Sequence, residues 1–334
     1  MRALVTGGSG CLGRALIARL LANGGSCRIF DLEDPFRGSP PSGAEFVEGD
    51  IREWEQVRRA VHGTDVVFHL AAAVHTGIDA DGVRDVNVGG TANVVRAAAS
   101  CGARRIVLAS TIGLYGLDSG QGIGEDQVQD PKTPYARSKQ AAEQLVLGAV
   151  GVEGVVLRFP VVYGPFDRGN VSRLIEAISR KRFVQFGNAK HARATISSYR
   201  AAEAAWLAAQ SVAASGQAIH AADVPHPTLS SLIHEIREAL SADGLLLRLP
   251  WSVGWAAAHC CDALKALTGT SPSFSTSVFN KIFAPLSLDC TKAQDLLGLP
   301  AGCELAKGIR DEVAWLRATG RVAGVQTAAA RRHE

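Results

Sequence analysis

The sequence predicts an α/β fold: a doubly wound parallel sheet with helices on both faces, plus a smaller C-terminal α/β substrate lobe. Three observations predict it. Short aliphatic runs alternate with helical segments in the first half of the chain, a glycine-rich turn follows the first run, and the second half is mainly helical with only short strands. Strands that alternate with helices imply right-handed crossovers, and therefore parallel strands.

The first half supplies the strands of this sheet. Helical segments over 52–61, 82–101 and 136–149 separate most of the aliphatic runs, and a further helix follows the glycine turn. Six runs are predicted as buried strands: 2–6, 27–31, 44–50, 65–72, 104–110 and 154–160. Residues 1–165 are therefore predicted to form the dinucleotide-binding domain, with some later segments returning to it.

The second half changes character. Residues 166–320 are predicted to form mainly the substrate lobe, beside the carboxyl ends of the strands, where ligands bind in open α/β sheets. The polar, basic residues 321–334 are predicted to be a flexible tail. The lobe is expected to contain helices near 170–180, 199–214, 228–240, 250–268 and 304–318, short strands near 183–186, 217–221 and 245–248, and a loop at 269–273.

Composition excludes several classes of protein. The net charge of the 334 residues is +3 with basic and acidic residues interleaved, which argues against a nucleic-acid partner. Seven cysteines without a Cys-x-x-Cys motif fit free thiols in a reducing, cytoplasmic compartment. No metal site is expected, because His259, Cys260 and Cys261 lie in an apolar helical stretch and are interpreted as core. The chain begins directly with a strand, so no signal peptide is expected. The apolar stretch 249–261 is only about half of the roughly 20 residues that a membrane span needs.

The turn after the first strand carries the first functional motif. Gly7, Gly10 and Gly13 are spaced G-x-x-G-x-x-G, and a second spacing, G-x-G-x-x-G, starts at Gly8. Glycine allows a tight turn and a close approach to a pyrophosphate, and the following helix start offers free N–H groups. The strand before the turn and the helix after it favour a dinucleotide site over an ordinary turn.

The end of the second strand indicates which dinucleotide binds. Asp31 follows Gly13 by 18 residues, close to the position at which an acid binds the ribose hydroxyls. Its charge, with that of Glu33 and Asp34, repels a 2′-phosphate, so NAD is favoured over NADP. Arg28 and Arg37 are the nearby cations that could reverse this preference.

Several motifs together resemble the extended short-chain dehydrogenases/reductases, the group that includes NAD-dependent epimerases, dehydratases and 3β-hydroxysteroid dehydrogenases. These motifs, in chain order, are TGGSGCLG at 6–13, GDIRE at 49–53, DVVFHLAA at 65–72, NVGGTANVV at 87–95, the AST and LYG pieces of 109–116, YARSK at 135–139, LRFPVVYGP at 157–165, and the last matches at 289–298. The resemblance covers nearly the whole chain and implies a Rossmann-type domain with bound NAD. It implies cofactor contacts from Gly7, Gly10, Cys11, Leu12, Gly13, Asp50, Ile51, Leu70, Ala71, Ala72, Pro160 and Val161.

The segment TPYARSK is predicted to hold the reacting groups. Tyr135 and Lys139 share a helix face at i, i+4. A neighbouring ammonium favours phenolate, so Lys139 is expected to lower the pKa of Tyr135, which then acts as acid or base. The resemblance implies that Thr111 orients the substrate oxygen, with Ser110 as second choice, and that Tyr135 and Lys139 also contact the cofactor.

The substrate pocket is less clearly marked. His75, Tyr163 and Arg193 are its main candidates, and Phe166 and Tyr199 are weaker ones. The sequence also departs from sugar-nucleotide relatives, which usually place Asn where Val161 stands and follow the Arg193 position with paired acids that are missing here. Ile112 and Gly113 stand directly after Thr111, where 4,6-dehydratases have acidic residues, so the dehydratase chemistry of the family is not supported.

Residues 250–283 resemble the apolar segment of the 3β-hydroxysteroid dehydrogenase-like branch. Trp251, Val253, Trp255 and Leu264 could line a pocket, pack on the smaller lobe, or contact a membrane, and the sequence leaves these alternatives open. The expected function is hydride transfer between NAD and a secondary alcohol or ketone that is steroid-like or otherwise small and apolar. An NAD-dependent sugar-nucleotide epimerase is the alternative, a non-catalytic NAD-sensing protein is a third possibility, and a homodimer is expected through the helices at 82–101 and 136–149.

Overall fold

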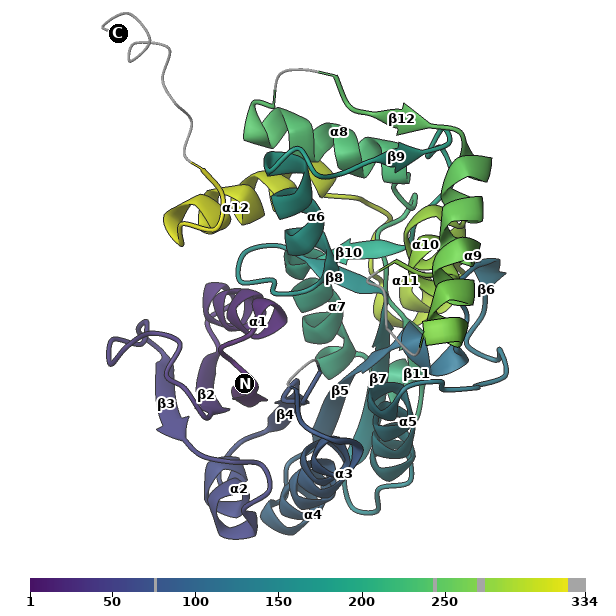
Figure 1. Ribbon diagram of the computed structural model, residues 1–334. Coiled ribbons are helices and arrows are strands. Elements are labelled where there is room, and N and C mark those ends of the chain that lie inside the picture. Colours follow the sequence, from purple (N-terminus) through teal and green to yellow (C-terminus); the bar gives the residue numbers. More distant parts are fainter. Residues whose placement is uncertain (75–76, 243–244, 269–273, 324–334) are drawn as a thin grey trace, which may run out of the picture.

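A computed structural model describes residues 1–74, 77–242, 245–268 and 274–323, and its centre is a seven-stranded parallel sheet (Figure 1). The strands, in the order in which they lie, are β11 (Ala218–His220), β7 (Glu153–Phe159), β5 (Arg105–Thr111), β4 (Val66–His69), β1 (Arg2–Thr6), β2 (Ser26–Asp31) and β3 (Ala44–Glu48). The chain moves outward from β1 to β3 and then returns to β4 on the other side of β1. The carboxyl ends of β1 and β4 therefore form the topological switch point at which α/β sheets bind ligands.

Helices cover both faces of this sheet (Figure 1). Alternation along β1 explains the two layers: Ala3 and Val5 join the core under one set of helices, and Leu4 joins the core under the other. One face is covered by α1 (Cys11–Ala22) and α7 (Ser198–Gln210). The other face is covered by α2 (Trp54–Val61), α4 (Gly90–Cys101) and α5 (Pro134–Leu147). The helix predicted over 82–101 begins as α3 (Ala80–Arg84) and passes through a π-helical turn, η1 (Asp85–Gly89), into α4.

The smaller lobe has its own apolar core, built around Tyr163, Ile236, Phe279 and Ile309. Its helices are α6 (Asn170–Ser179), α8 (Leu229–Leu240), α9 (Trp251–Thr268), α10 (Thr276–Phe283) and α12 (Leu305–Ala318). Helix α11 (Thr291–Leu297) instead packs on α7 and β11, in the core of the large sheet. Three two-stranded parallel pairs are the remaining strands of the described residues: β8 (Val161–Tyr163) with β10 (Thr195–Ser197), β9 (Gln185–Phe186) with β12 (Arg248–Leu249), and β6 (Gly120–Ile123) with β13 (Leu286–Leu288). The 3₁₀ turns are η2 (Ile112–Tyr115) and η3 (Val212–Ala214).

Two predicted strands of the smaller lobe were placed wrongly. The strand predicted at 217–221 is β11, which pairs with β7 in the large sheet, because α7 packs on the face of that sheet and returns the chain to its edge. The strand predicted at 245–248 is β12, which begins only at Arg248 and is two residues long. The loop at 269–273 and residues 324–334 of the predicted tail lie outside the described residues.

Helix α9 packs through its small residues. Gly254 and Ala258 face inward, and a Cβ on Gly254 would lie 2.5 Å from Phe279. His259 and Cys260 are exposed, so their interpretation as core residues is wrong. An apolar composition on all sides of a helix does not by itself show which side is buried. Among the described residues, no His, Cys, Asp and Glu side chains are grouped to hold a metal ion, and no helix is long and apolar enough to cross a bilayer.

Candidate cofactor and active site

The glycine-rich turn lies at the switch point, between β1 and α1. Gly7 has φ +72°, and a Cβ there would lie 2.6 Å from the backbone nitrogen of Ala71; a Cβ on Gly13 would lie 2.4 Å from the carbonyl oxygen of Gly7. No side chain fits at these positions. Gly10, the N-cap of α1, provides no side-chain cap, so the first N–H groups of the helix are available to an anion. The turn fits a pyrophosphate, and Cys11 and Leu12 begin the helix beside it.

The carboxylate of Asp31 faces this turn from the end of β2. Its Oδ2 accepts hydrogen bonds from the backbone nitrogen of Ser9 (2.8 Å) and from its hydroxyl (2.7 Å), and its Oδ1 accepts one from the backbone of Leu32. The acid is therefore held at the edge where a ribose would follow the pyrophosphate. This geometry fits the prediction of an acid that binds the ribose hydroxyls.

A cation beside this turn, Arg14, was missed in the sequence analysis. Arg14 donates to the carbonyl oxygens of Ser9 (3.1 Å) and Pro35 (2.7 Å), and its guanidinium lies 3.9 Å from the ring centre of Phe166. Arg28 instead bonds Glu45 and backbone carbonyls near the end of α2. The position of Arg14 directly after the last motif glycine was the available signal.

Two further loops bring predicted cofactor contacts to the same edge. Asp50 and Ile51 follow β3; hydrogen bonds from Arg52 hold the pKa of the Asp50 carboxyl below its usual range, and Ile51 packs against Gly90. Leu70, Ala71 and Ala72 follow β4.

A buried polar chain fixes the loop after β4. The backbone nitrogens of Leu70 and Ala71 donate to the hydroxyl of Thr6 (3.2 and 3.3 Å), which contacts His69 at 2.8 Å. The other ring nitrogen of His69 lies 2.9 Å from the hydroxyl of Thr91. Burial lowers the pKa of His69 to about 3, so the imidazole is neutral and joins β1, β4 and α4.

The candidate reacting groups lie on α5 and at the end of β5. Thr133 caps α5 by accepting from the backbone of Ala136 (3.1 Å), and Tyr135 stands in the first turn. Lys139, one turn further on, is 2% exposed. Thr111 ends β5, where its hydroxyl accepts from Gly113 (3.0 Å) and caps η2; both β5 and η2 pack against α5. All three side chains thus come from segments in direct contact.

The protonation of this pair differs from the expected one. Burial raises the pKa of Tyr135 to about 12, although a neighbouring ammonium was expected to lower it. Burial also lowers the pKa of Lys139 to about 8, against the attraction of Glu143. Desolvation by burial is the largest cause of both shifts.

Behind this pair lies a buried network that the sequence analysis missed. Glu143, one turn beyond Lys139, accepts from Nη2 of Arg158 (2.8 Å) and from the hydroxyl of Ser110 (2.5 Å). Arg158 also donates to Tyr115 (2.8 Å), whose hydroxyl lies 2.6 Å from the ring nitrogen of His220. The hydroxyl of Ser110 donates its proton to Glu143, whereas the hydroxyl of Thr111 accepts from Gly113 and keeps its own proton to donate, so Thr111 remains the first candidate. In the sequence, Glu143 follows Lys139 at the same i, i+4 spacing that separates Lys139 from Tyr135, and this spacing could have indicated that Glu143 lies on the same face of α5.

The predicted substrate residues have different surroundings. His75 lies outside the described residues. Tyr163 is wholly buried and donates to Asp223 (2.9 Å), so it is a core residue and its expected place on a pocket wall is wrong. Arg193 donates to the carbonyl oxygens of Lys281 and Ala284 at the end of α10.

The weaker candidates are also engaged. Tyr199 donates to Asp311 (2.7 Å), and Phe166 lies between Arg14 and Trp315. Pro160 is buried and Val161, which begins β8, is half-buried.

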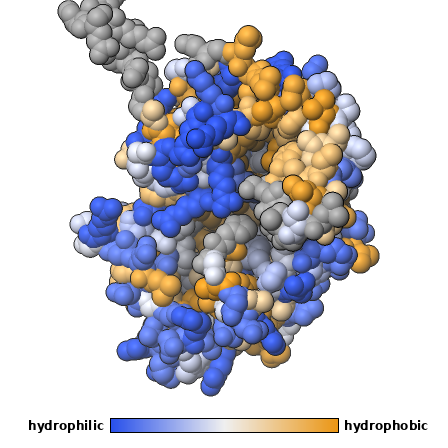
Figure 2. All heavy atoms as spheres, in the orientation of Figure 1, coloured by the Kyte–Doolittle hydropathy of each residue, from blue (hydrophilic) through white to orange (hydrophobic). Residues whose placement is uncertain are grey.

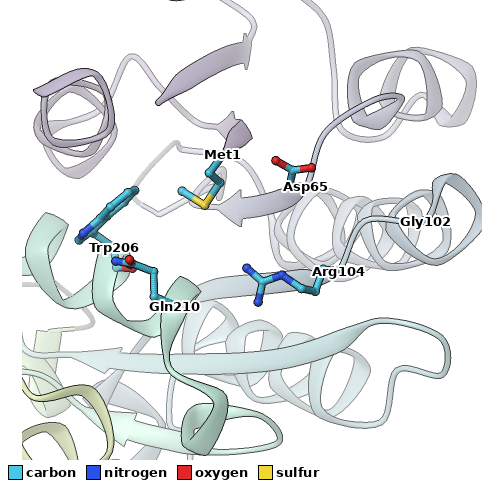
Figure 3. Close-up of a pocket in the computed structure, with 6 residues that line it drawn as sticks. All are labelled: Met1, Asp65, Gly102, Arg104, Trp206 and Gln210. Atoms are coloured by element: carbon cyan, nitrogen blue, oxygen red, sulfur yellow. The ribbon is translucent and has the colours of Figure 1, made fainter. Parts of the chain in front are cut away.

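A cavity of about 350 Å³ lies elsewhere, among segments that precede β1, β4 and β5 and against α7 (Figure 3). Its lining residues are Met1, Asp65, Gly102, Arg104, Trp206 and Gln210. Because these segments lie at the amino ends of the strands, the cavity is on the opposite edge of the sheet from the glycine turn. It is not part of the candidate active site.

Residues 3–222 match the NAD dependent epimerase/dehydratase family. The chain is 26% identical to an N-acetyl-alpha-D-glucosaminyl-diphospho-ditrans,octacis-undecaprenol 4-epimerase of Escherichia coli O157:H7, with 92% of each chain covered. It is 30% identical to a 2-alkyl-3-oxoalkanoate reductase of Stenotrophomonas maltophilia, over 79% of this chain and 83% of the relative. The solved structure of UDP-glucuronic acid 4-epimerase from Bacillus cereus in complex with NAD has a TM-score of 0.73 at 20% identity, with 96% and 99% coverage.

The sheet, its switch point and the glycine turn define a dinucleotide-binding enzyme of the extended short-chain dehydrogenase/reductase type. The chain belongs to the NAD-dependent epimerase/dehydratase family, and its cofactor is NAD.

Proposed function

We propose that this chain transfers hydride between NAD and a secondary alcohol or ketone of apolar, steroid-like or similar character, with Tyr135 as the acid/base. The observation that carries the proposal is the arrangement of Tyr135 and Lys139 one turn apart on α5, against the end of β5 that carries Thr111. This places a phenol, an ammonium and a hydroxyl on segments in direct contact.

The residues at the switch point and along the carboxyl edge of the sheet fit NAD. Gly7, Gly10 and Gly13 would hold the pyrophosphate, Asp31 the ribose, and Asp50 with Ile51 the adenine. The loop at 70–72 would lie along the cofactor, and Pro160 and Val161 beside the nicotinamide. NAD supplies the hydride acceptor or donor when it is bound.

The chain's own residues move the proton. Tyr135 donates its hydroxyl proton to the carbonyl oxygen as a ketone is reduced, and accepts it from the hydroxyl as an alcohol is oxidised. Thr111 would hold the same oxygen by a hydrogen bond. Lys139, when charged, stabilises the phenolate by Coulomb attraction in a site of low dielectric constant.

An apolar substrate is favoured because side chains that would bind a polar substrate are replaced or already engaged. Val161 offers no hydrogen-bonding side chain at the position where sugar-nucleotide relatives usually have Asn. The guanidinium of Arg193 is bound to two carbonyl oxygens of α10 and is not free for a diphosphate. One relative that matches over most of the chain is named as a reductase of an alkyl ketone acid.

Epimerisation of a sugar on a diphosphate is the second candidate. It is favoured by the 4-epimerase of a lipid-linked sugar that matches over 92% of this chain. An epimerase oxidises and re-reduces one carbon, so NAD would co-purify with the protein and no net NADH would appear.

The test compares Tyr135→Phe with Tyr199→Phe, a matched loss of one hydroxyl outside the proposed reacting groups. NADH formation is followed with hydroxysteroids, other secondary alcohols, free sugars and UDP-sugars. We expect the wild type to oxidise an apolar alcohol and Tyr135→Phe to lose at least about a hundredfold in kcat. NAD affinity in both variants, and kcat in Tyr199→Phe, should stay near the wild type.

Two results would contradict the proposal. One is full activity of Tyr135→Phe on every substrate that the wild type turns over. The other is binding and epimerisation of a UDP-sugar without net NADH, which would establish the second candidate.

A homodimer that forms through α3–α4 and α5 is also part of the proposal, as the family resemblance implies. Light scattering of the purified protein tests it, since the mass of a monomer would rule it out.

A further inference from the structure

A groove of about 780 Å³ lies in the smaller lobe, away from the glycine turn. It is formed by α8, by the segment after β9 and by the segment that leads into β12. Four of its lining side chains are basic or can become so: Lys190, His234, Arg237 and Arg248. None of the described lining residues is acidic, so the groove favours anions.

An exposed apolar surface continues from this groove onto α9. Leu245 is fully exposed, Leu247 is 56% exposed, and Trp251 and Trp255 are each 45% exposed. Trp251 lies against Gly187, directly after β9, so the groove and the outer face of α9 are neighbours. Figure 2 shows apolar surface over the region where Figure 1 places β12 and α9.

The packing of α9 explains why these side chains remain outside. The helix contacts the lobe closely through Gly254 and Ala258, and the ring of Trp251 packs edge-on against Phe279, yet Trp251, Val253 and Trp255 each stay 45% exposed. Large side chains that gather in one exposed area are typical of a binding surface, whereas scattered ones are not.

We propose that this surface, named here the α8–α9 face and made of Leu245, Leu247, Arg248, Trp251 and Trp255 with the groove lining, docks onto an anionic phospholipid bilayer. Basic side chains beside exposed Leu and Trp match the two layers of such a surface: headgroup phosphates outside and acyl chains beneath. Tryptophan prefers the boundary between them. The described helices include none that could span a bilayer, so the contact is peripheral.

The charge distribution separates this occupant from two others. A second copy seated on the same face would bring Lys190 and Arg248 of both copies together, and none of the described lining residues is a carboxylate that could offset this repulsion. A small free anion would use the groove but would leave Leu245, Leu247 and both tryptophans exposed. In a bilayer, anionic headgroups would pair with the basic side chains of the groove, and the acyl region would cover the exposed Leu and Trp side chains.

The test is co-sedimentation of the full chain with vesicles of phosphatidylcholine alone, and with vesicles of three parts phosphatidylcholine to one part phosphatidylglycerol. We expect binding to the mixed vesicles that weakens in high salt. Each basic residue near the surface contributes about fivefold in affinity, so Lys190→Glu with Arg248→Glu should lose at least tenfold. Leu245→Ser with Leu247→Ser should lose at least about fivefold while leaving salt sensitivity in place.

The matched control is Arg59→Glu with Val150→Ser, a charge reversal on α2 and an 89% exposed valine after α5, both outside the α8–α9 face. It should bind vesicles within about twofold of the wild type. Melting curves check that all variants fold.

Three outcomes would overturn the proposal. One is failure of the wild type to bind the mixed vesicles, and another is unchanged vesicle binding by both double variants, Lys190→Glu with Arg248→Glu and Leu245→Ser with Leu247→Ser. The third outcome combines no vesicle binding by the wild type with one of two other results. These are binding of inorganic phosphate by the wild type, or a different mass in light scattering for the Leu245→Ser with Leu247→Ser variant than for the wild type. It would assign the face to a small anion or to a second copy.

Discussion

The replacement Lys139→Met should stabilise the protein near neutral pH while it removes the proposed catalytic ammonium. Lys139 is 2% exposed, and burial lowers its pKa from 10.5 to about 8. In the folded protein the charged form of Lys139 is therefore disfavoured, because burial removes its ammonium group from water. Methionine fills a similar length of side chain without a charge.

The pKa shift sets the magnitude. It amounts to 10.5 − 8 = 2.5 units, and each unit corresponds to about 1.4 kcal/mol, so the charged lysine lowers the free energy of unfolding by about 3 kcal/mol below pH 8. Between pH 8 and 10.5 the unfolded chain binds more protons than the folded one, so the stability of the wild type rises with pH. The advantage of methionine should therefore shrink over this window and nearly vanish at its upper end.

Denaturant unfolding of the ligand-free protein at several pH values from 7 to about 10.5 measures this difference. Lys292→Met, at an exposed position on α11, is the control and should change stability little at any pH. If Lys139→Met is no more stable than the wild type at pH 7, or if its advantage does not depend on pH, the desolvation argument is wrong.

Two further predictions concern Asp31, at the carboxyl edge of the sheet where NAD is proposed to bind (the cofactor edge), and the buried pair of Glu143 and Arg158. Asp31→Asn should weaken NAD binding about tenfold, because it removes a charged acceptor for the ribose hydroxyls, and should narrow the preference for NAD over NADP, because it removes the repulsion of the 2′-phosphate. Calorimetry with both nucleotides measures the two affinities. An unchanged preference would count against the ribose role of Asp31. Glu143→Leu should lower the free energy of unfolding by about 3 kcal/mol, since it leaves the Arg158 charge buried without its partner, and adding Arg158→Met should restore much of it. If the losses of unfolding free energy from the two replacements simply add in the double variant, the interpretation of Glu143 and Arg158 as a buried ion pair is wrong.

The cofactor edge was predictable because its signals are local. Strand, glycine turn and helix follow one another within residues 2–22, and the steric demands of Gly7 and Gly13 arise within the turn and its neighbouring loop. The spacing of Tyr135 and Lys139 likewise needs only the period of one helix. Their roles stay predictions, but their placement on α5 follows from the sequence.

What the sequence by itself determined, then, was the alternation of strands and helices, the turn between β1 and α1, and the face of α5. Only the tertiary structure decided that Glu143 pairs with Arg158, that β11 joins the large sheet, that Tyr163 is buried, and that α9 presents its tryptophans outward. The reason is the range of the interactions. Backbone geometry and side-chain period act over a few residues, whereas burial and pairing depend on which distant segments pack together.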